Sequence, residues 1–238
     1  MTSSIFGSTK TRSQQDSEHW MGVSDLMAGL MMVFLFIAIS YMGFVKVKQK
    51  DIKEVATAYR KGQEAIYLSL LQEFENDLEG WDAYVDAESL SFEFRSPEVL
   101  FETGKIDLQP RFKEILDDFF PRYIEVLREH RPDINEVRIE GHTSSIWNAS
   151  TTDDEAYFNN MWLSQGRTRS VLGYVYESPA IVADKDWVKR YVAAVGFSSS
   201  RPILNSSGRE DQTRSRRVTF RVTTDVDIKM REIMERVL

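Results

Sequence analysis

One acidic residue stands at the start of a long apolar stretch of the chain. Asp25 lies within residues 20–45, and no charged residue occurs between Leu26 and Val45. At about 1.5 Å per residue, a helix of this length spans the roughly 30 Å hydrocarbon core of a bilayer. A carboxylate at the edge of lipid is costly unless it faces a partner or a water path, where it can bind and release a cation. Asp25 is therefore a candidate ion-binding residue.

A structural role is the alternative for Asp25. Serine and acidic residues stabilise the first turn of a helix, so Ser24 or Asp25 would serve as its cap. Ala28 and Gly29 lie one turn further along the same face, where small side chains leave room for a partner helix. Position alone leaves both interpretations open.

A second candidate is a cation in the C-terminal half of the chain. Arg167 lies in the first turns of a predicted helix, after Asn160 and Leu163. A guanidinium forms bidentate pairs with carboxylates, which suits the free carboxylate of a peptide ligand. The alternative is an ordinary exposed arginine, the commonest environment of this residue.

Basic residues also cluster near the C-terminus of this acidic chain. The formal net charge is −7 and the pI is near 5.2, which argues against a general nucleic-acid binder. The cluster comprises Arg209, Arg214, Arg216 and Arg217, and no aromatic stacking platform accompanies it. We expect an anion site or solvation of a strand end, and no nucleic-acid partner.

The sequence gives no pattern for catalysis or for a metal site. It contains no cysteine, and its three histidines are scattered, which excludes thiolate sites and a histidine cluster. His142 follows a predicted strand, where we expect a hydrogen-bonded structural role. The chain is expected not to be an enzyme and to need no cofactor.

The N-terminal third is predicted to be helical around these residues. A polar tail over 1–19 precedes the membrane helix at 20–45, and a charged helical stretch follows over 46–80. That stretch carries an apolar stripe at helical spacing, which fits a dimer contact, a plug or a stalk. The stripe consists of Ile52, Val55, Ala56, Tyr59, Gln63, Ile66, Leu70 and Phe74.

Residues 81–224 are predicted to form one α+β domain. Apolar periodicity and turn residues give the order β-α-β-α-β-β, with helices covering one face of the strands in a sandwich. The expected elements are strands at 89–95, 135–140 and 216–223, a further strand at the end of segment 187–197, helices at 111–130 and 160–177, a loop at 144–157, and a C-terminal helix at 225–238.

Four short motifs in this domain resemble the OmpA-like peptidoglycan-binding family. They are Phe101-x-x-Gly104-x-x-x-Leu108, Val137-Arg-Ile-Glu-Gly-His-Thr143, Asn160-x-x-Leu163-Ser-x-x-Arg167, and Gly196-Phe-x-x-x-Arg-Pro202 followed by Ser215-Arg-Arg-Val218. The resemblance covers about residues 89–224, and it implies a peptidoglycan site that includes Asn160, Leu163, Arg167 and Arg217.

The chain departs from that family at one position of the implied site. The family has an aspartate directly after Gly-His-Thr, where this chain has Ser144. The predicted loop that follows carries Asp153, Asp154 and Glu155. Our hypothesis is that one of these acids substitutes; the alternative is a weakened or altered cell-wall site.

The whole arrangement resembles the MotB class of stator subunits. A single membrane helix with an acid near its start, a stalk and an OmpA-like domain are typical of that class, and residues 24–36 look most like the MotB-like subunits of Zorya anti-phage defence systems. The resemblance implies a homodimer inside a ring of a MotA-like multi-helix membrane subunit (ZorA-like). Asp25 would carry transported H⁺ or Na⁺, and the domain would grip peptidoglycan.

Two predictors of orientation disagree. Lys46, Lys48, Lys50 and Lys53 outnumber the two basic residues of the leader, which favours a cytoplasmic C-terminal domain. A wall-binding domain has its ligand only in the periplasm. We expect a single-pass protein of the bacterial inner membrane, with a cytoplasmic N-terminus and a periplasmic domain. The alternatives are a passive membrane-to-wall tether without ion conduction and a cytoplasm-facing membrane adaptor.

Overall fold

The computed structural model describes residues 11–95 and 97–225, and it contains two compact units, Met1–Glu54 and Val55–Leu238. The first ten residues of the predicted tail lie outside the described residues. So does the predicted C-terminal helix, apart from Asp225.

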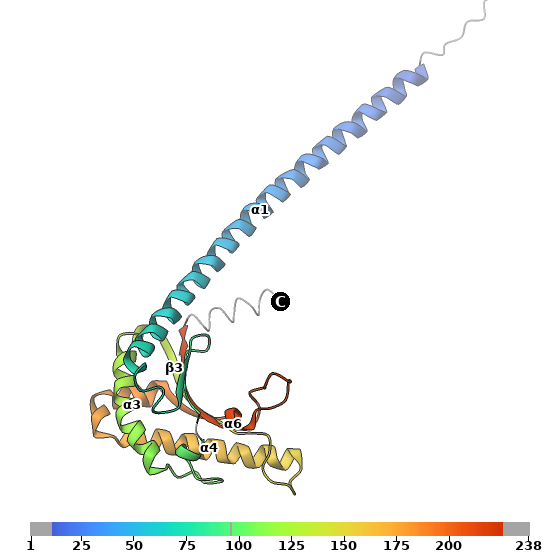
Figure 1. Ribbon diagram of the computed structural model, residues 1–238. Helices are drawn as coiled ribbons and strands as arrows, with labels where there is room; N and C mark the ends of the chain where they lie inside the picture. Colours follow the sequence, from blue (N-terminus) through green and yellow to red (C-terminus); the bar gives the residue numbers. More distant parts are fainter. Residues whose placement is uncertain (1–10, 96, 226–238) are drawn as a thin grey trace, which may run out of the picture. The chain divides into compact units, whose positions relative to one another are not determined.

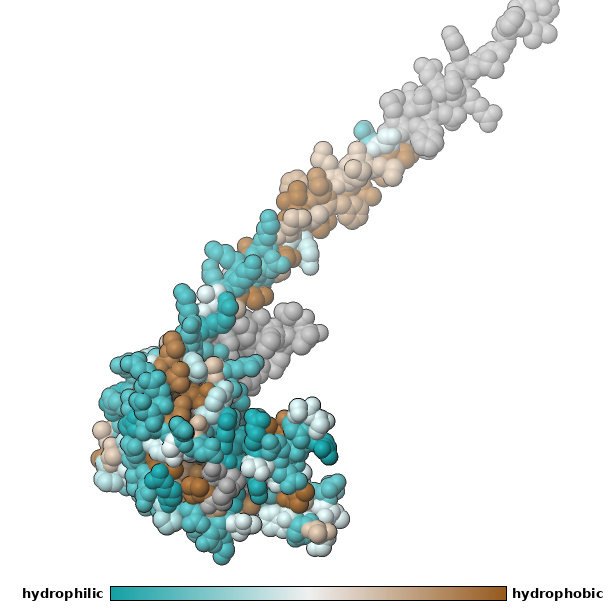
Figure 2. Space-filling model, in the orientation of Figure 1, coloured by the Kyte–Doolittle hydropathy of each residue, from teal (hydrophilic) through white to brown (hydrophobic). Residues whose placement is uncertain are grey.

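Helix α1 (Thr11–Phe74) begins inside the predicted tail and contains the whole predicted membrane segment (Figure 1). Within the first unit it holds one stretch, Val23–Glu54, that is long and apolar enough to cross a membrane. Leu26, Phe36 and their apolar neighbours are largely exposed on this stretch, and Figure 2 shows a hydrophobic segment of the helix followed by a mainly hydrophilic one. Such a surface needs lipid or a partner helix to cover it.

The last turns of α1 belong to the second unit. Ile66, Leu70 and Phe74 are fully buried there and join the core of the domain. These three residues are the C-terminal part of the apolar stripe predicted in residues 46–80. That part of the stripe therefore packs within the domain and not against a dimer partner.

The second unit is built on a five-stranded mixed sheet, which confirms the predicted α+β class. The strands are β1 (Ala83–Asp86), β2 (Ser91–Phe94), β3 (Ile134–His142), β4 (Val192–Gly196) and β5 (Arg217–Thr224). Their order is β1-β2-β5-β3-β4, with β3 and β4 parallel and the other pairs antiparallel. Strand β1 was not predicted. Strand β4 lies at the end of segment 187–197, as expected, and a short helix α5 (Lys185–Tyr191) precedes it.

Two long helices, α3 (Pro110–Arg128) and α4 (Asp153–Glu177), supply the rest of the core. Two four-residue helices, α2 (Pro97–Leu100) and α6 (Gln212–Ser215), and 3-10 turns at Arg131–Asp133 and Pro179–Asp184 complete the domain. Phenylalanine rings fill the centre of the core: Phe119 of α3 lies 4.6 Å from Phe92 and 5.0 Å from Phe220 between ring centroids. Large aromatic side chains bury much apolar area each, so this cluster is a main source of the domain's stability.

Helix α4 approaches the sheet closely because two strand ends carry glycine. A Cβ atom on Gly141, at the end of β3, would lie 2.8 Å from the backbone oxygen of Ser164. A Cβ on Gly196, at the end of β4, would lie 2.4 Å from the backbone nitrogen of Gln165. Only glycine allows this separation, so the two glycines set the position of the first half of α4 above the strand ends.

Candidate functional site

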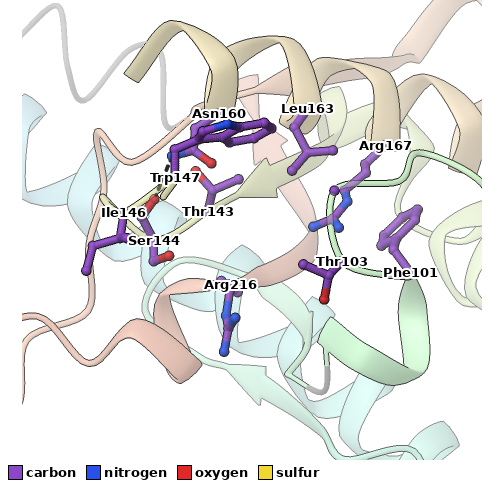
Figure 3. Close-up of a pocket in the computed structure, with 11 residues that line it drawn as sticks. Phe101, Thr103, Thr143, Ser144, Ile146, Trp147, Asn160, Leu163, Arg167 and Arg216 are labelled. Carbon is purple, nitrogen blue, oxygen red and sulfur yellow. Dashed lines mark hydrogen bonds between the residues drawn. The ribbon is translucent and has the colours of Figure 1, made fainter. Parts of the chain in front are cut away.

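A cavity of about 240 Å³ opens beside the first half of α4, where β3 ends. Three other segments complete it: the loop after β3, the loop after α2, and the residue before β5 (Figure 3). The lining residues are Phe101, Thr103, Gly104, Thr143, Ser144, Ile146, Trp147, Asn160, Leu163, Arg167 and Arg216. Four residues predicted for the site, Ser144, Asn160, Leu163 and Arg167, are thereby brought together.

Helix α4 supplies three of these residues from one face. Asn160, Leu163 and Arg167 are spaced by three and four residues, so their side chains project to the same side of the helix. The Asn160 side-chain Nδ2 donates a hydrogen bond of 3.1 Å to the backbone oxygen of Ser144 (Figure 3). This bond ties the helix to the loop after β3, and it fixes the mouth of the cavity.

Arg167 is held rigidly at the wall of the cavity. Its side-chain Nε donates to the backbone oxygen of Lys105 at 2.9 Å, and Nη2 donates to that of Glu102 at 3.1 Å. The guanidinium carbon lies 4.7 Å from the centre of the Phe101 ring. Within the described part of the chain Nη1 has no hydrogen-bond partner, so it is free to contact a ligand. Burial, with a smaller contribution from the positive charge of Arg216, lowers the pKa of Arg167 to about 10.

A second cation, Arg216, lines the cavity in place of the predicted Arg217. The Nε atom of Arg216 is buried and has no hydrogen-bond partner among the described residues, and the same is true of Thr143 Oγ1, which also lines the cavity. Arg217 lies outside this lining: its Nε is 4.0 Å from Glu93, its Nη1 donates to the backbone oxygen of Ser215, and it lines a much smaller cavity next to Arg167.

The acids proposed to replace the family aspartate do not line the cavity. Asp153 and Asp154 lie exposed in the first turn of α4, within the segment predicted as a loop. That turn is fixed by a capping box between Thr152 and Glu155, a pattern visible in the sequence. Among the described residues, the lining contains no carboxylate.

A different acid contacts the loop after β3. Both carboxylate oxygens of Glu210 accept hydrogen bonds from the backbone nitrogen of Ser145, at 3.0 and 3.3 Å, and one also accepts from the Ser145 hydroxyl. Glu210 therefore positions the residue next to Ser144 without lining the cavity itself. It is 65 residues away in sequence, and no local pattern predicts the contact.

The contacts of His142 are those of a buried residue that stabilises the fold. Its Nε2 lies 3.4 Å from a side-chain oxygen of Glu140, and its ring stacks on Phe197 with centroids 5.4 Å apart. Desolvation by burial lowers the pKa of His142. Among the described residues, no group of three or more metal-binding side chains comes together.

Asp25 lies in the first unit, near the start of the stretch that is long enough to cross a membrane. Asp25 is exposed, and so are Ala28 and Gly29 on the next turn. Nothing lies within 4 Å of the position that a Cβ of Gly29 would take. This part of the helix is therefore open to a close-packed partner.

The chain combines a helix long enough to cross a membrane with an α+β domain that holds this cavity, the arrangement that the sequence resemblance to MotB-like subunits with an OmpA-like domain implies. No family model matches the chain. The chain belongs to the ZorB family of Zorya proteins, because it is 54% identical over 231 residues to the Zorya protein ZorB of Escherichia coli, covering 97% of this chain and 98% of that protein.

Solved structures also resemble the chain. A MotB-like protein from Desulfovibrio vulgaris is 23% identical, with a TM-score of 0.49 over 69% of this chain and 96% of that one. The cell wall anchor of the T6SS from Pseudomonas aeruginosa is 21% identical, with a TM-score of 0.45 over 66% of this chain and 97% of that one. The periplasmic domain of Helicobacter pylori MotB is 15% identical, with a TM-score of 0.39 over 62% of this chain and 85% of that one.

Proposed function

We propose that this chain is a non-enzymatic stator-type subunit of an ion-driven membrane complex in Zorya anti-phage defence, and that it is anchored to peptidoglycan. The observation that carries the proposal is the presence, in one chain, of an acid at the start of a membrane-length helix and of a cavity lined by Asn160, Leu163 and Arg167. Membership of the ZorB family supports the link to defence.

In the membrane-spanning part of α1, Asp25 binds and releases the transported H⁺ or Na⁺. Two copies of α1 stand inside a ring of a MotA-like multi-helix subunit (ZorA-like), whose helices cover the exposed apolar surface and give Asp25 its dry surroundings. A carboxylate in a membrane helix is costly without such a partner or a water path. The open space around Gly29 suits the close packing of helices in a membrane.

In the second unit, the cavity binds the stem peptide of peptidoglycan and holds the dimer still while the partner ring moves. Arg167 pairs with a carboxylate of the stem peptide through its free Nη1, and Asn160 and Leu163 shape the wall. This role requires the domain to lie in the periplasm, whereas the number of lysines next to the membrane helix favours the cytoplasm.

Protease treatment of intact spheroplasts tests the orientation: cleavage of the domain supports the proposal, and protection supports a cytoplasm-facing adaptor.

The second candidate function is a passive tether with the same anchor and the same wall site. The two functions differ at Asp25, because a tether has no use for an intramembrane carboxylate other than a helix cap. An Asp25→Asn substitution keeps the size and capping capacity of the side chain and removes its charge.

The test is phage protection by cells that carry the complete defence system. We expect Asp25→Asn to abolish protection. The matched control is Glu54→Gln, the same change of acid to amide at the other end of the stretch, where the carboxylate forms an exposed pair of 3.7 Å with Lys50, an interaction that contributes little. Full protection by Asp25→Asn, at equal protein levels, would leave the passive tether as the function.

A further inference from the structure

His142 and Glu140 form a buried ionisable pair at the end of β3, outside the lining of the cavity beside α4. Their exposed fractions are 4% and 3%, and His142 Nε2 lies 3.4 Å from Glu140 Oε2. Arg201, in the loop after β4, donates to the same oxygen from Nη1, also at 3.4 Å. One carboxylate oxygen therefore serves two groups, a histidine on the strand and an arginine on a distant loop.

The ring of Phe197 joins the same two groups. It stacks on the His142 ring, with 9° between the ring planes and 5.4 Å between the centroids, and the Arg201 guanidinium carbon lies 3.7 Å from its centre. This cation–π contact adds to the charge-assisted hydrogen bond from Arg201 to Glu140. We call Glu140, His142, Phe197 and Arg201 the latch, because together they attach the loop over residues 198–211 to β3.

The other end of this loop supports the cavity. Its Glu210 accepts hydrogen bonds of 3.0 and 3.3 Å from the backbone nitrogen of Ser145, in the loop after β3. The loop also closes on itself, since the backbone nitrogen of Asp211 donates to the backbone oxygen of Ile203 at 2.7 Å. Arg201 and Glu210 are therefore two attachment points of one closed loop, and a release at the first weakens the second.

His142 fits the latch in its neutral form. The neutral ring donates from Nε2 to Glu140, and among the described residues its buried Nδ1 has no hydrogen-bond partner. A proton added to Nδ1 would create a buried donor without an acceptor, which is costly. It would also bring a second cation to the carboxylate oxygen that already pairs with Arg201, so the two cations would compete for it.

The other charges around His142 also oppose its protonation. Arg217 lies directly across from it in the pairing of β3 with β5, and Arg167 of α4 lines the same cavity of about 10 Å³ as these two residues. Glu93 of β2, 4.0 Å from Arg217 Nε, offsets part of that positive charge. Burial is the main reason that the pKa of His142 lies below its ordinary value of 6.5, and it outweighs the opposing attraction of the neighbouring carboxylate.

We propose that the latch positions the loop after β3 in a pH-dependent way: neutral His142 keeps it closed, and protonated His142 displaces Arg201 from Glu140 and opens it. The loop over residues 198–211 then detaches from β3, and Glu210 loosens its hold on Ser145. The latch is a property of the domain alone. In the proposed function it would make the grip on the cell wall depend on the pH of the periplasm, and only this consequence rests on that function.

Hydrogen exchange of the full-length chain in detergent, followed by mass spectrometry, tests the proposal. The reporters are the segments that contain the amides of Asp211 and Ser145, which are both bonded in the closed loop. After correction for the intrinsic pH dependence of exchange, we expect both to exchange roughly tenfold faster as the pH falls from about 8 to 5, the effect of one lost charge-assisted hydrogen bond. Unchanged protection of both segments over this range would overturn the proposal.

Two variants test the named residues. His142→Gln keeps a side chain that can donate to Glu140 and cannot take up a proton in this range, so its reporters should stay protected at every pH. Arg201→Met keeps a long side chain over Phe197 and removes the charge, so its reporters should exchange at pH 8 as fast as those of wild type at pH 5. The matched control is Arg214→Met, at an exposed arginine outside the latch, which should follow wild type.

The variants are first compared with wild type by circular dichroism and melting temperature. A folded His142→Gln whose loop still opens in acid would assign the pH response to another group, and the proposal would be wrong. Protected reporters at pH 8 in folded Arg201→Met would also contradict it. If His142→Gln does not fold, an NMR titration of the histidine rings of wild type decides: the loop must open at the pH at which His142 takes up its proton, and two different midpoints refute the latch.

Discussion

Arg167 stabilises the domain and, in the proposed function, also contacts the ligand. Its bonds to the backbone oxygens of Glu102 and Lys105 attach the loop after α2 to α4, and the Phe101 ring packs against the guanidinium. Among the described residues, these bonds leave the two N–H donors of Nη1 for a ligand. Loss of this side chain therefore affects both the fold and the binding, and any binding measurement on it needs a folding control.

The sequence predicted the cavity residues that α4 supplies. It did not predict contacts between residues that are far apart along the chain. Asn160, Leu163 and Arg167 stand in a short motif whose helical setting is local. Arg216, which lines the cavity, was not predicted, since the side to which a residue points before a strand depends on where the strand begins. Glu210 was missed altogether, because only the folded chain brings it to Ser145.

A buried carboxylate outside the cavity makes a prediction about pH. Asp184 has 8% of its side chain exposed and pairs with Arg128, at 3.0 Å, and with Arg131. Desolvation alone would raise the pKa of Asp184, but the hydrogen bonds from Arg131 and Arg128 outweigh it and lower the pKa below its ordinary value. We expect Asp184→Asn to cost about 1–2 kcal/mol at pH 7, less than for a fully buried pair since both arginines reach solvent.

The sign of the pH dependence follows from the lowered pKa. The unfolded chain binds the proton more readily than the folded one, so the stabilisation is complete above the unfolded pKa near 4 and is lost as the pH falls through the folded pKa. In urea denaturation, wild type and Asp184→Asn should differ at pH 7, and the difference should begin to shrink as the pH falls below about 4. The control Asp186→Asn, an exposed acid two residues on, should match wild type throughout. A difference that stays constant down to pH 3 would contradict this assignment.

At the scale of elements, the approach of α4 to the sheet decides whether the cavity exists. In Gly141→Ala, the new Cβ would lie 2.8 Å from both Ser164 O and Thr168 Cγ2, which pushes the helix away from β3. We expect a loss of about 1–3 kcal/mol in unfolding free energy, typical of overpacking, and weaker ligand binding.

Gly173→Ala is the matched control on the same helix. Nothing lies within 4 Å of its Cβ position, and alanine in place of an exposed helical glycine stabilises by about 0.5–1 kcal/mol. The melting temperature should therefore fall for Gly141→Ala and rise or stay equal for Gly173→Ala. Equal melting temperatures for Gly141→Ala and wild type would show that the separation of helix and sheet is not set by this glycine.

The elements themselves were predicted where apolar periodicity is strong, as in α3 and in strands β2, β3 and β5. Strand β1 is four residues long, and only one of them is buried, so it gives almost no alternation. The start of α4 at Asp153 was placed seven residues too late. The first turn there is polar, and its signal was the capping box of Thr152 and Glu155 rather than a hydrophobic stripe.

At the scale of the whole molecule, the chain consists of two compact units with different features. The first offers an apolar helix with one acid near its start, and the second offers a rigid cationic cavity. The sequence predicted this division from composition alone, since a run of apolar residues long enough for a membrane is its strongest signal. It did not predict that residues 66–74 belong to the core of the domain, because a helical stripe looks the same whether it faces its own domain or a partner.

The central claim is that the cavity of the second unit anchors the chain to the cell wall. Co-sedimentation of the full-length chain with purified peptidoglycan sacculi tests it most directly, with Arg167→Ala as the variant and Arg169→Ala, an exposed arginine on the same helix, as the control. We predict that wild type and Arg169→Ala sediment with the sacculi and that Arg167→Ala, shown by circular dichroism to be folded, remains in the supernatant. Sedimentation of folded Arg167→Ala to the same extent as wild type would contradict the account.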